Sequence, residues 1–263
     1  MSVVPNTIAK VTAMNPSTVE QLKTLRLSGM LEAWSEQHTT PTYHDLGFDE
    51  RFSLLVEREH YRRSQQRLQR RLKQAQLSTT ASVTDIDFAV PRGLVKSTFL
   101  ELSSGQWVQE QLNLIVVGPT GVGKTFLSSV LANACCTLGH TVRYLRSADL
   151  LLEFKLAKAD GSFPKLQCQL ASFGLLIFDD WLRDPLLPQD ARDLLDLLDL
   201  RYRKASSLFA TQIPVNQWHQ QIADPTLADA ILDRIVHGSL RLGLKGESMR
   251  KLTSKVTPQL ESA

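Results

Sequence analysis

The sequence predicts an α/β fold, in which a parallel sheet with flanking helices follows a helical N-terminal domain. After residue 80, short apolar runs alternate with segments of helical periodicity. Strands and helices in alternation are typical of a parallel sheet that is covered on both faces. Before residue 80, the apolar pattern is helical. The change in pattern therefore predicts two structurally different regions.

The composition excludes several classes of protein. Of the 263 residues, 43% are hydrophobic and 22% are charged, which is ordinary for a globular chain and excludes wholesale disorder. The net charge is only +3, so affinity for a polyanion requires local clusters of charge. No apolar run approaches the ~20 residues that span a bilayer, so no membrane partner is expected. A signal-peptide pattern is absent and the 3 cysteines form no CxxC pair, so a cytoplasmic location is expected.

Two helices are expected in the N-terminal region. Ser17 and Glu20 have the spacing of a capping box, ahead of the apolar-periodic stretch Val19–Trp34. Asp49 is a second start signal, for a long helix that ends near Leu77.

A Ser/Thr-rich stretch, LSTTASV at residues 77–83, breaks this periodicity. The expected division is a helical domain at 1–80, a linker at 81–95 and an α/β domain at 96–263. The strands expected in the last domain are Leu114–Val117, Thr141–Leu145, Leu175–Phe178, Ser207–Ala210 and Ser239–Leu242. The helices expected between them are Thr125–Leu138, Ala148–Ala159 and Gln189–Lys204.

The sharpest signal is a glycine-rich loop between an expected strand and an expected helix. It fits the pattern GxxxxGK followed by Ser or Thr, and its residues are Gly118, Pro119, Thr120, Gly121, Val122, Gly123, Lys124 and Thr125. The glycines let consecutive backbone N–H groups turn toward a phosphate, and the helix adds its positive N-terminal end. Lys124 then suits the β- and γ-phosphates, and the Thr125 hydroxyl suits Mg²⁺.

Two acids follow the buried strand Leu175–Phe178, at the edge where parallel sheets bind ligands. Asp179 suits Mg²⁺, through a water molecule, and Asp180 suits polarisation of the attacking water. The nearest match to the guanine-recognition pattern Asn/Thr-Lys-x-Asp is Ala157–Asp160, which lacks the first side chain. ATP and Mg²⁺ are therefore the expected cofactors, and ATP hydrolysis is the expected reaction.

Four ordered blocks carry a family resemblance: SGQWVQEQLNLIVVGPTGVGKT, LLIFDDW, ARDLLDLLDLRYRKAS and DPTLADAILDRIVHGSLRLGLKGESMRK. Through them, the chain from Pro91 to Lys251 resembles the IstB family of transposition helper ATPases, which are relatives of the DnaC helicase loaders. The resemblance implies a P-loop AAA+ (ASCE) fold, in which the P-loop is the glycine-rich loop from Gly118 to Thr125. In this fold the strand before the P-loop lies beside the fourth strand. The resemblance also implies ATP-driven self-association on duplex DNA and an IstA-like partner transposase.

Little or no C-terminal lid is expected, because the chain after Ser239–Leu242 is too short for the helical lid of larger AAA+ proteins. Nucleotide binding should then depend on neighbouring subunits. The ATPase is therefore expected to be weak in isolation and to be stimulated by DNA and by assembly.

The resemblance implies two more polar groups in the ATP site. A polar residue at the end of the fourth strand should orient the lytic water, and Thr211 and Gln212 both stand there. An arginine of a neighbouring subunit should reach the γ-phosphate and stabilise charge in the transition state. Arg234 is the candidate because it follows an apolar helical stretch, as the family's arginine does. Arg241 and Arg250 are its rivals.

Two segments outside the P-loop are candidates for ligand contact. In the linker, Ile86 and Phe88 either pack near the adenine or anchor the segment to the domain. In the long helix, a basic stripe is expected on one face at 100° per residue, formed by Arg63, Arg67, Arg70 and Arg71. Such a stripe would bind a DNA backbone without reading its sequence, or an acidic protein surface. The resemblance favours DNA.

The leading hypothesis is a transposition helper that oligomerises on duplex DNA, remodels it for a transposase and is reset by ATP hydrolysis. A DnaC-like helicase loader would share the ATPase but prefer single-stranded DNA. A small-molecule kinase would transfer phosphate to an acceptor without benefit from DNA. A nucleotide-gated architectural protein would keep its turnover unchanged after Asp180→Asn.

Overall fold

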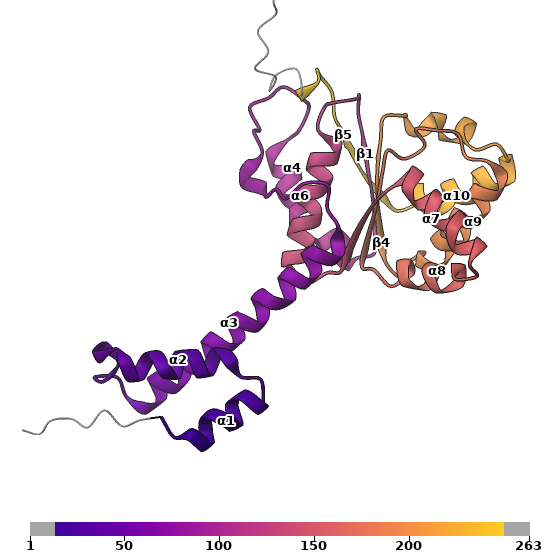
Figure 1. Ribbon diagram of the computed structural model, residues 1–263. Helices are drawn as coiled ribbons and strands as arrows, with labels where there is room; N and C mark the ends of the chain where they lie inside the picture. The colour runs from indigo at the N-terminus through magenta and orange to yellow at the C-terminus, as the bar shows by residue number, and fades with distance from the viewer. Residues whose placement is uncertain (1–13, 250–263) are drawn as a thin grey trace, which may run out of the picture. The chain divides into compact units, whose positions relative to one another are not determined.

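The computed structural model describes residues 14–249. The chain forms two compact units that divide between Gln69 and Arg70, inside one long helix (Figure 1). The linker expected at 81–95 falls within the second unit by this division, and the expected domain boundaries stay predictions. Within the described part of the chain, no helix combines the length and the apolarity needed to cross a membrane.

Three helices build the first unit: α1 (Pro16–Thr24), α2 (Ser28–Thr39) and most of α3 (Phe48–Ala75). The sequence predicts one helix over Val19–Trp34, and this prediction is wrong. The chain turns between α1 and α2, where Arg26 adopts a left-handed φ of 57°. A residue in this conformation ends a helix, whatever the apolar period on either side of it.

The start of α1 also differs from the prediction. Asn15, rather than Ser17, is the N-cap, and its side chain accepts a hydrogen bond from the Ser17 amide at 3.0 Å. Pro16 occupies the first helical turn, where its missing N–H has no helical partner to lose. Glu20 instead accepts a hydrogen bond from the Lys23 ammonium at 2.8 Å.

A buried carboxylate joins α3 to α2. Glu59 accepts hydrogen bonds from the amides of Gly29 at 2.7 Å and Met30 at 3.2 Å, in the first turn of α2. Burial alone would raise the pKa of Glu59, but hydrogen bonds from Arg63 and from these two amides hold it below its ordinary value. The negative charge thus faces the positive end of α2.

The second unit contains a 5-stranded parallel sheet in the order β2-β3-β4-β1-β5. The strands are β1 (Asn113–Val117), β2 (Val142–Arg146), β3 (Leu175–Asp179), β4 (Ser206–Thr211) and β5 (Ser239–Gly243). Each coincides with an expected strand to within one residue at either end. Because β4 pairs with both β3 and β1, the fourth strand lies beside the P-loop strand, as the resemblance implies.

Helices cover both faces of this sheet (Figure 1). On one face lie α4 (Lys96–Ser103) and α6 (Lys124–Thr137). On the other lie α7 (Ser147–Ala159), α8 (Phe163–Ala171), α9 (Pro188–Arg201) and α10 (Pro225–Val236). Shorter elements are α5 (Gln106–Gln109) and the 3-10 helices Pro41–Tyr43, Val83–Asp85 and Val215–Gln221. The expected fold class is confirmed.

The two central strands, β3 and β4, lie in the core. Every residue of β3 and β4 is buried, as expected for central strands with helices on both faces. Phe178 of β3 stacks on Phe209 of β4 with ring centroids 4.9 Å apart, and Trp181 packs against both rings. This packing fixes the ends of β3 and β4, where the polar site residues begin.

Candidate nucleotide-binding site

The glycine-rich loop connects β1 to α6 at the carboxyl edge of the sheet. Gly121 and Gly123 have φ angles of 80° and 101°, which residues with a Cβ rarely adopt. This backbone allows the loop amides to converge beside the N-terminus of α6, an arrangement that suits an anion. Gly121 and Gly123 thus have backbone angles that suit a phosphate-binding loop, and the nucleotide contacts of the eight residues from Gly118 to Thr125 stay predictions.

Lys124 is folded back onto the loop. Its Nζ donates hydrogen bonds to the carbonyl oxygens of Gly118 at 2.8 Å and Pro119 at 2.9 Å. Partial burial lowers the pKa of Lys124, while the charges of Asp179 and Asp180 oppose that shift. The ammonium group thus lies close to two acids and is held by neutral carbonyls, which phosphate oxygens can replace.

The Asp179 carboxylate is held through both of its oxygens. Oδ2 accepts hydrogen bonds from Thr125 Oγ1 at 2.7 Å and Tyr144 Oη at 2.6 Å, and Oδ1 accepts one from the Asp180 amide at 3.0 Å. Asp179 is 2% exposed and Tyr144 is 7% exposed, so these bonds form away from bulk water. Burial and the bond to Asp179 raise the pKa of Tyr144, which keeps the proton on the tyrosine.

This donor set fits Mg²⁺. The Thr125 hydroxyl and the Asp179 carboxylate are hard oxygen ligands that lie 2.7 Å apart. Mg²⁺ is usually bound through one or two protein oxygens of this kind together with phosphate oxygens and water. Thr125 and Asp179 are therefore the residues that would hold it, and this assignment stays a prediction.

Asp180 occupies a strained backbone position directly after β3. Its φ is 52°, in the left-handed region that few non-glycine residues adopt. Its side chain is 43% exposed, and Oδ2 lies 3.5 Å from Arg183 Nη1. The carboxylate is thus open to water at the same edge of the sheet as Lys124, which suits the predicted role of polarising a water molecule.

The structure separates the two candidates at the end of β4. Thr211 is fully buried, and its hydroxyl donates to the Trp181 carbonyl at 2.7 Å and accepts from the Ile213 amide at 3.0 Å. Gln212 is exposed, and its Oε1 accepts a hydrogen bond from Thr120 Oγ1 at 2.5 Å. The Thr211 hydroxyl is therefore engaged in the turn, whereas Gln212 already contacts the P-loop.

Arg234 lies at the amino ends of the strands, whereas the P-loop lies at their carboxyl ends. Its carbonyl accepts a hydrogen bond at 3.1 Å from the side chain of Asn113, the first residue of β1. The 5 residues of β1, at about 3.3 Å each, separate these amino ends from the P-loop by roughly 16 Å. Arg234 Nε donates to Asp199 Oδ1 at 2.8 Å. From this position, Arg234 can meet a γ-phosphate only if a second copy of the chain brings it.

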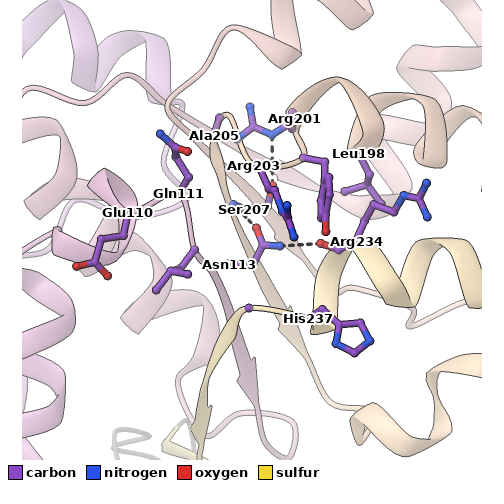
Figure 2. Close-up of a pocket in the computed structure, with 13 residues that line it drawn as sticks. Glu110, Gln111, Asn113, Leu198, Arg201, Arg203, Ala205, Ser207, Arg234 and His237 are labelled. Atoms are coloured by element: carbon purple, nitrogen blue, oxygen red, sulfur yellow. Dashed lines mark hydrogen bonds between the residues drawn. The ribbon is translucent and has the colours of Figure 1, made fainter.

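Arg234 lines a pocket of about 430 Å³ at the amino ends of β1 and β4 (Figure 2). Its basic lining residues are Arg201, Arg203, Arg234 and His237.

Of the two rivals of Arg234, Arg241 is exposed on β5, and Arg250 lies outside the described residues. The assignment of the arginine that acts in a neighbouring site stays a prediction.

The basic stripe on α3 is partly occupied by internal contacts. Arg63 is ion-paired within α3 at 2.6 Å, and Arg71 Nη1 donates to the Cys136 carbonyl of α6 at 3.1 Å. Arg67 and Arg70 are exposed, and neither has a hydrogen bond or ion pair among the described residues. All four stay predicted DNA contacts, and the last two are the most available.

Tyr144 and Arg92 lie close to the P-loop and belong to none of the motifs. Tyr144 stands in an apolar strand and therefore looks like a core residue in the sequence; only the pairing of β2 with β3 brings its hydroxyl to Asp179. In the linker, Phe88 packs edge-on against Phe99 of α4 at 6.2 Å, so it anchors the segment. No sequence pattern could have identified these pairings, because each one depends on tertiary packing.

Replacement of Tyr144 by phenylalanine should weaken Mg²⁺ binding while sparing nucleotide binding without metal. The change removes only the hydroxyl that orients Asp179, and loss of such a supporting hydrogen bond typically costs roughly 10-fold in metal affinity. Calorimetric titration of ATP with and without Mg²⁺ measures both quantities. Ser147→Ala is the matched control, because Ser147 Oγ contacts the Asp179 carbonyl at 3.0 Å rather than its carboxylate. An unchanged Mg²⁺ dependence in Tyr144→Phe would contradict the expectation.

The parallel sheet, the glycine-rich loop between β1 and α6 and the aspartate at the end of β3 together define a protein of the P-loop nucleotide-binding class. Residues 20–257 match the family described as IstB-like ATP-binding protein. The chain belongs to this family.

Relatives in this family match the chain over most of its length. A protein of Sinorhizobium fredii, named as an insertion sequence ATP-binding protein, is 40% identical over 234 residues, which are 89% of this chain and 96% of that protein. The ATP-binding protein of insertion sequence IS21 from Pseudomonas aeruginosa is 31% identical over 232 residues, which are 88% of this chain and 86% of that protein.

Solved structures share the fold of part of this chain. The crystal structure of DnaI has a TM-score of 0.54 and 17% identity, over 62% of this chain and 90% of that chain. AMPPCP-bound DnaA from Aquifex aeolicus has a TM-score of 0.54 and 15% identity, over 66% of this chain and 53% of that chain. At this level of identity, the likeness concerns the fold alone.

Proposed function

We propose that the chain is an Mg²⁺-dependent ATPase whose P-loop exchanges internal contacts for those of a nucleotide. The observation that carries this proposal is the 2.7 Å hydrogen bond between Thr125 and Asp179, which joins the P-loop to the acid at the end of β3. Lys124 leaves two carbonyls to bind the β- and γ-phosphates. Asp180 polarises the attacking water, and Gln212, beside Thr120, orients it.

The ATP site is completed by a second copy of the chain. Arg234 is separated from its own P-loop by the length of β1, and a trans-acting arginine stabilises charge on the transferred phosphoryl group. Self-association and hydrolysis are therefore linked. A dilute chain should hydrolyse ATP weakly, and assembly should stimulate the rate.

The biological role that fits this ATPase is that of a transposition helper. Relatives that cover nearly the whole chain are named as ATP-binding proteins of insertion sequences. In this role the chain forms oligomers on duplex DNA, remodels the duplex for a partner transposase, and is released by ATP hydrolysis. Arg67 and Arg70 are the leading contacts with the DNA backbone, because both are exposed and unpaired within the described part of α3.

The test is DNA binding by the full chain in the presence of an ATP analogue. Fluorescence anisotropy measures the affinity, and electron microscopy shows the oligomers. We expect ordered oligomers on duplex DNA, and weaker binding to single strands of equal length. The double variant Arg67→Gln/Arg70→Gln should reduce the slope of log affinity against log salt by about 0.9 for each lost phosphate contact.

Arg192→Gln is the control, since Arg192 is an exposed arginine of α9 outside the stripe. A preference for single strands would contradict the helper role and favour a helicase loader. An unchanged salt slope in the double variant would remove α3 from the DNA-binding surface.

A further inference from the structure

Arg92 is a buried charge whose side chain forms a single hydrogen bond among the described residues. It precedes α4, and the residue is only 3% exposed. One nitrogen, Nη2, donates to the Asp87 carbonyl at 3.3 Å, and Nε has no hydrogen-bond partner. Among the described residues, no carboxylate oxygen forms an ion pair with it, and Asp87 acts on it only at longer range. Burial lowers the pKa of Arg92. A buried cation in this condition is costly and calls for an explanation.

A second buried arginine shows how this fold satisfies such a group. Arg201 is 2% exposed, and all three of its guanidinium nitrogens donate hydrogen bonds. Its acceptors are the carbonyls of Leu170, Ala171, Phe173 and Ser206 and the hydroxyl of Ser207. Arg201 thus needs nothing from outside the chain. Arg92, equally buried, is left with unused donors.

One unused donor, Arg92 Nη1, lies against the P-loop. A Cβ at Gly123 would lie 3.0 Å from Arg92 Nη1, so the absence of a side chain at Gly123 is what admits the guanidinium. Gly123 is the N-cap of α6 and immediately precedes Lys124. The backbone holds Arg92 in place, because its carbonyl accepts a hydrogen bond from the Lys245 amide at 2.9 Å. The site therefore combines a helix N-terminus with a buried, under-partnered cation.

We propose that Arg92 is a nucleotide-binding residue whose guanidinium pairs with the phosphate chain at the part that ATP and ADP share. The proposal rests on the proposed function, since it takes the P-loop to be the nucleotide site. Arg92 lies where α6 begins, whereas Arg234 meets the γ-phosphate from a neighbouring copy. The bound anion supplies the partner that the chain itself does not. Arg92 therefore acts in one subunit, on ADP as well as on ATP.

The test is Arg92→Met in the full chain, with two measurements: the melting temperature without nucleotide and the dissociation constant for ADP. Without nucleotide, the melting temperature should stay unchanged or rise, because an apolar side chain replaces an incompletely paired buried charge. The dissociation constant for ADP, measured by calorimetry at a concentration where the chain is monomeric, should rise roughly 10- to 100-fold. Arg192→Met makes the same chemical change at an exposed site and should alter neither quantity.

Comparison of Arg92→Met with Lys124→Ala separates this proposal from the proposed function. Unchanged ADP affinity in Arg92→Met, with ADP binding lost in Lys124→Ala, would overturn the role of Arg92 alone. Unchanged binding in both variants would overturn the P-loop as the nucleotide site. A lower melting temperature without nucleotide would show that the chain already satisfies Arg92, and would overturn the argument. Arg92→Lys, which keeps the charge without the planar fork, is the second variant, and wild-type ADP affinity in it would also overturn the proposal.

Discussion

Lys124→Ala should weaken ATP binding roughly 100-fold or more and remove ATP-dependent assembly on DNA. In the free chain, Lys124 Nζ donates hydrogen bonds to two uncharged loop carbonyls at 2.8 and 2.9 Å, so its removal breaks no direct ion pair among the described residues. With nucleotide bound, the same change removes a positive charge from the most negative part of the ligand. The folded state should therefore be spared while binding is lost, which calorimetry and the melting temperature measure together.

Lys165→Ala is the matched control, because Lys165 is an exposed lysine of α8 on the other face of the sheet. It should bind ATP like the wild type. If Lys124→Ala retained both nucleotide affinity and assembly on DNA, the phosphates would have to bind elsewhere, and the mechanism proposed for this site would be wrong.

Arg234→Ala should lower the maximal ATPase rate of the assembled protein roughly 10³-fold, the lower end of the effect of a trans-acting arginine. ATP binding by the dilute chain should change little, because Arg234 is far from its own P-loop. Asp180→Asn should also lose turnover, for a different reason: it keeps Arg234 but lacks the carboxylate that polarises water.

Mixing these two inactive variants is the decisive measurement. At a 1:1 ratio with random assembly, about one quarter of the interfaces would pair an intact Asp180 with an intact Arg234. The mixture should therefore recover about one quarter of the wild-type rate. Absence of any recovery, with assembly confirmed by light scattering, would show that Arg234 is not supplied by a neighbour.

The sheet could be predicted closely from the sequence because its central strands are buried on both faces. A run such as Leu175–Phe178 has no competing interpretation once acids follow it, and β3 ends one residue later, at Asp179. The P-loop is equally local, since its glycines encode backbone angles that no other residue adopts easily. These features depend on neighbours in the sequence, which a pattern can capture.

Other features depend on contacts between distant residues and could not be predicted in this way. The break between α1 and α2 falls at Arg26, where no glycine or proline marks it. The apolar period continues across the break, so the pattern predicts one helix. Thr211 and Gln212 are both polar residues at a strand end, and only the turn that engages the Thr211 hydroxyl distinguishes them.

Because Arg234 and the P-loop lie at opposite edges of one sheet, a row of subunits joined through them has two unlike ends. At one end, a nucleotide-bound site has no neighbouring subunit to supply Arg234. At the other end, Arg234 has no neighbouring site to enter. The nucleotide at the first end would outlast all those behind it. An open row would thus have one slowly hydrolysing site, at its end, and a closed ring would have none.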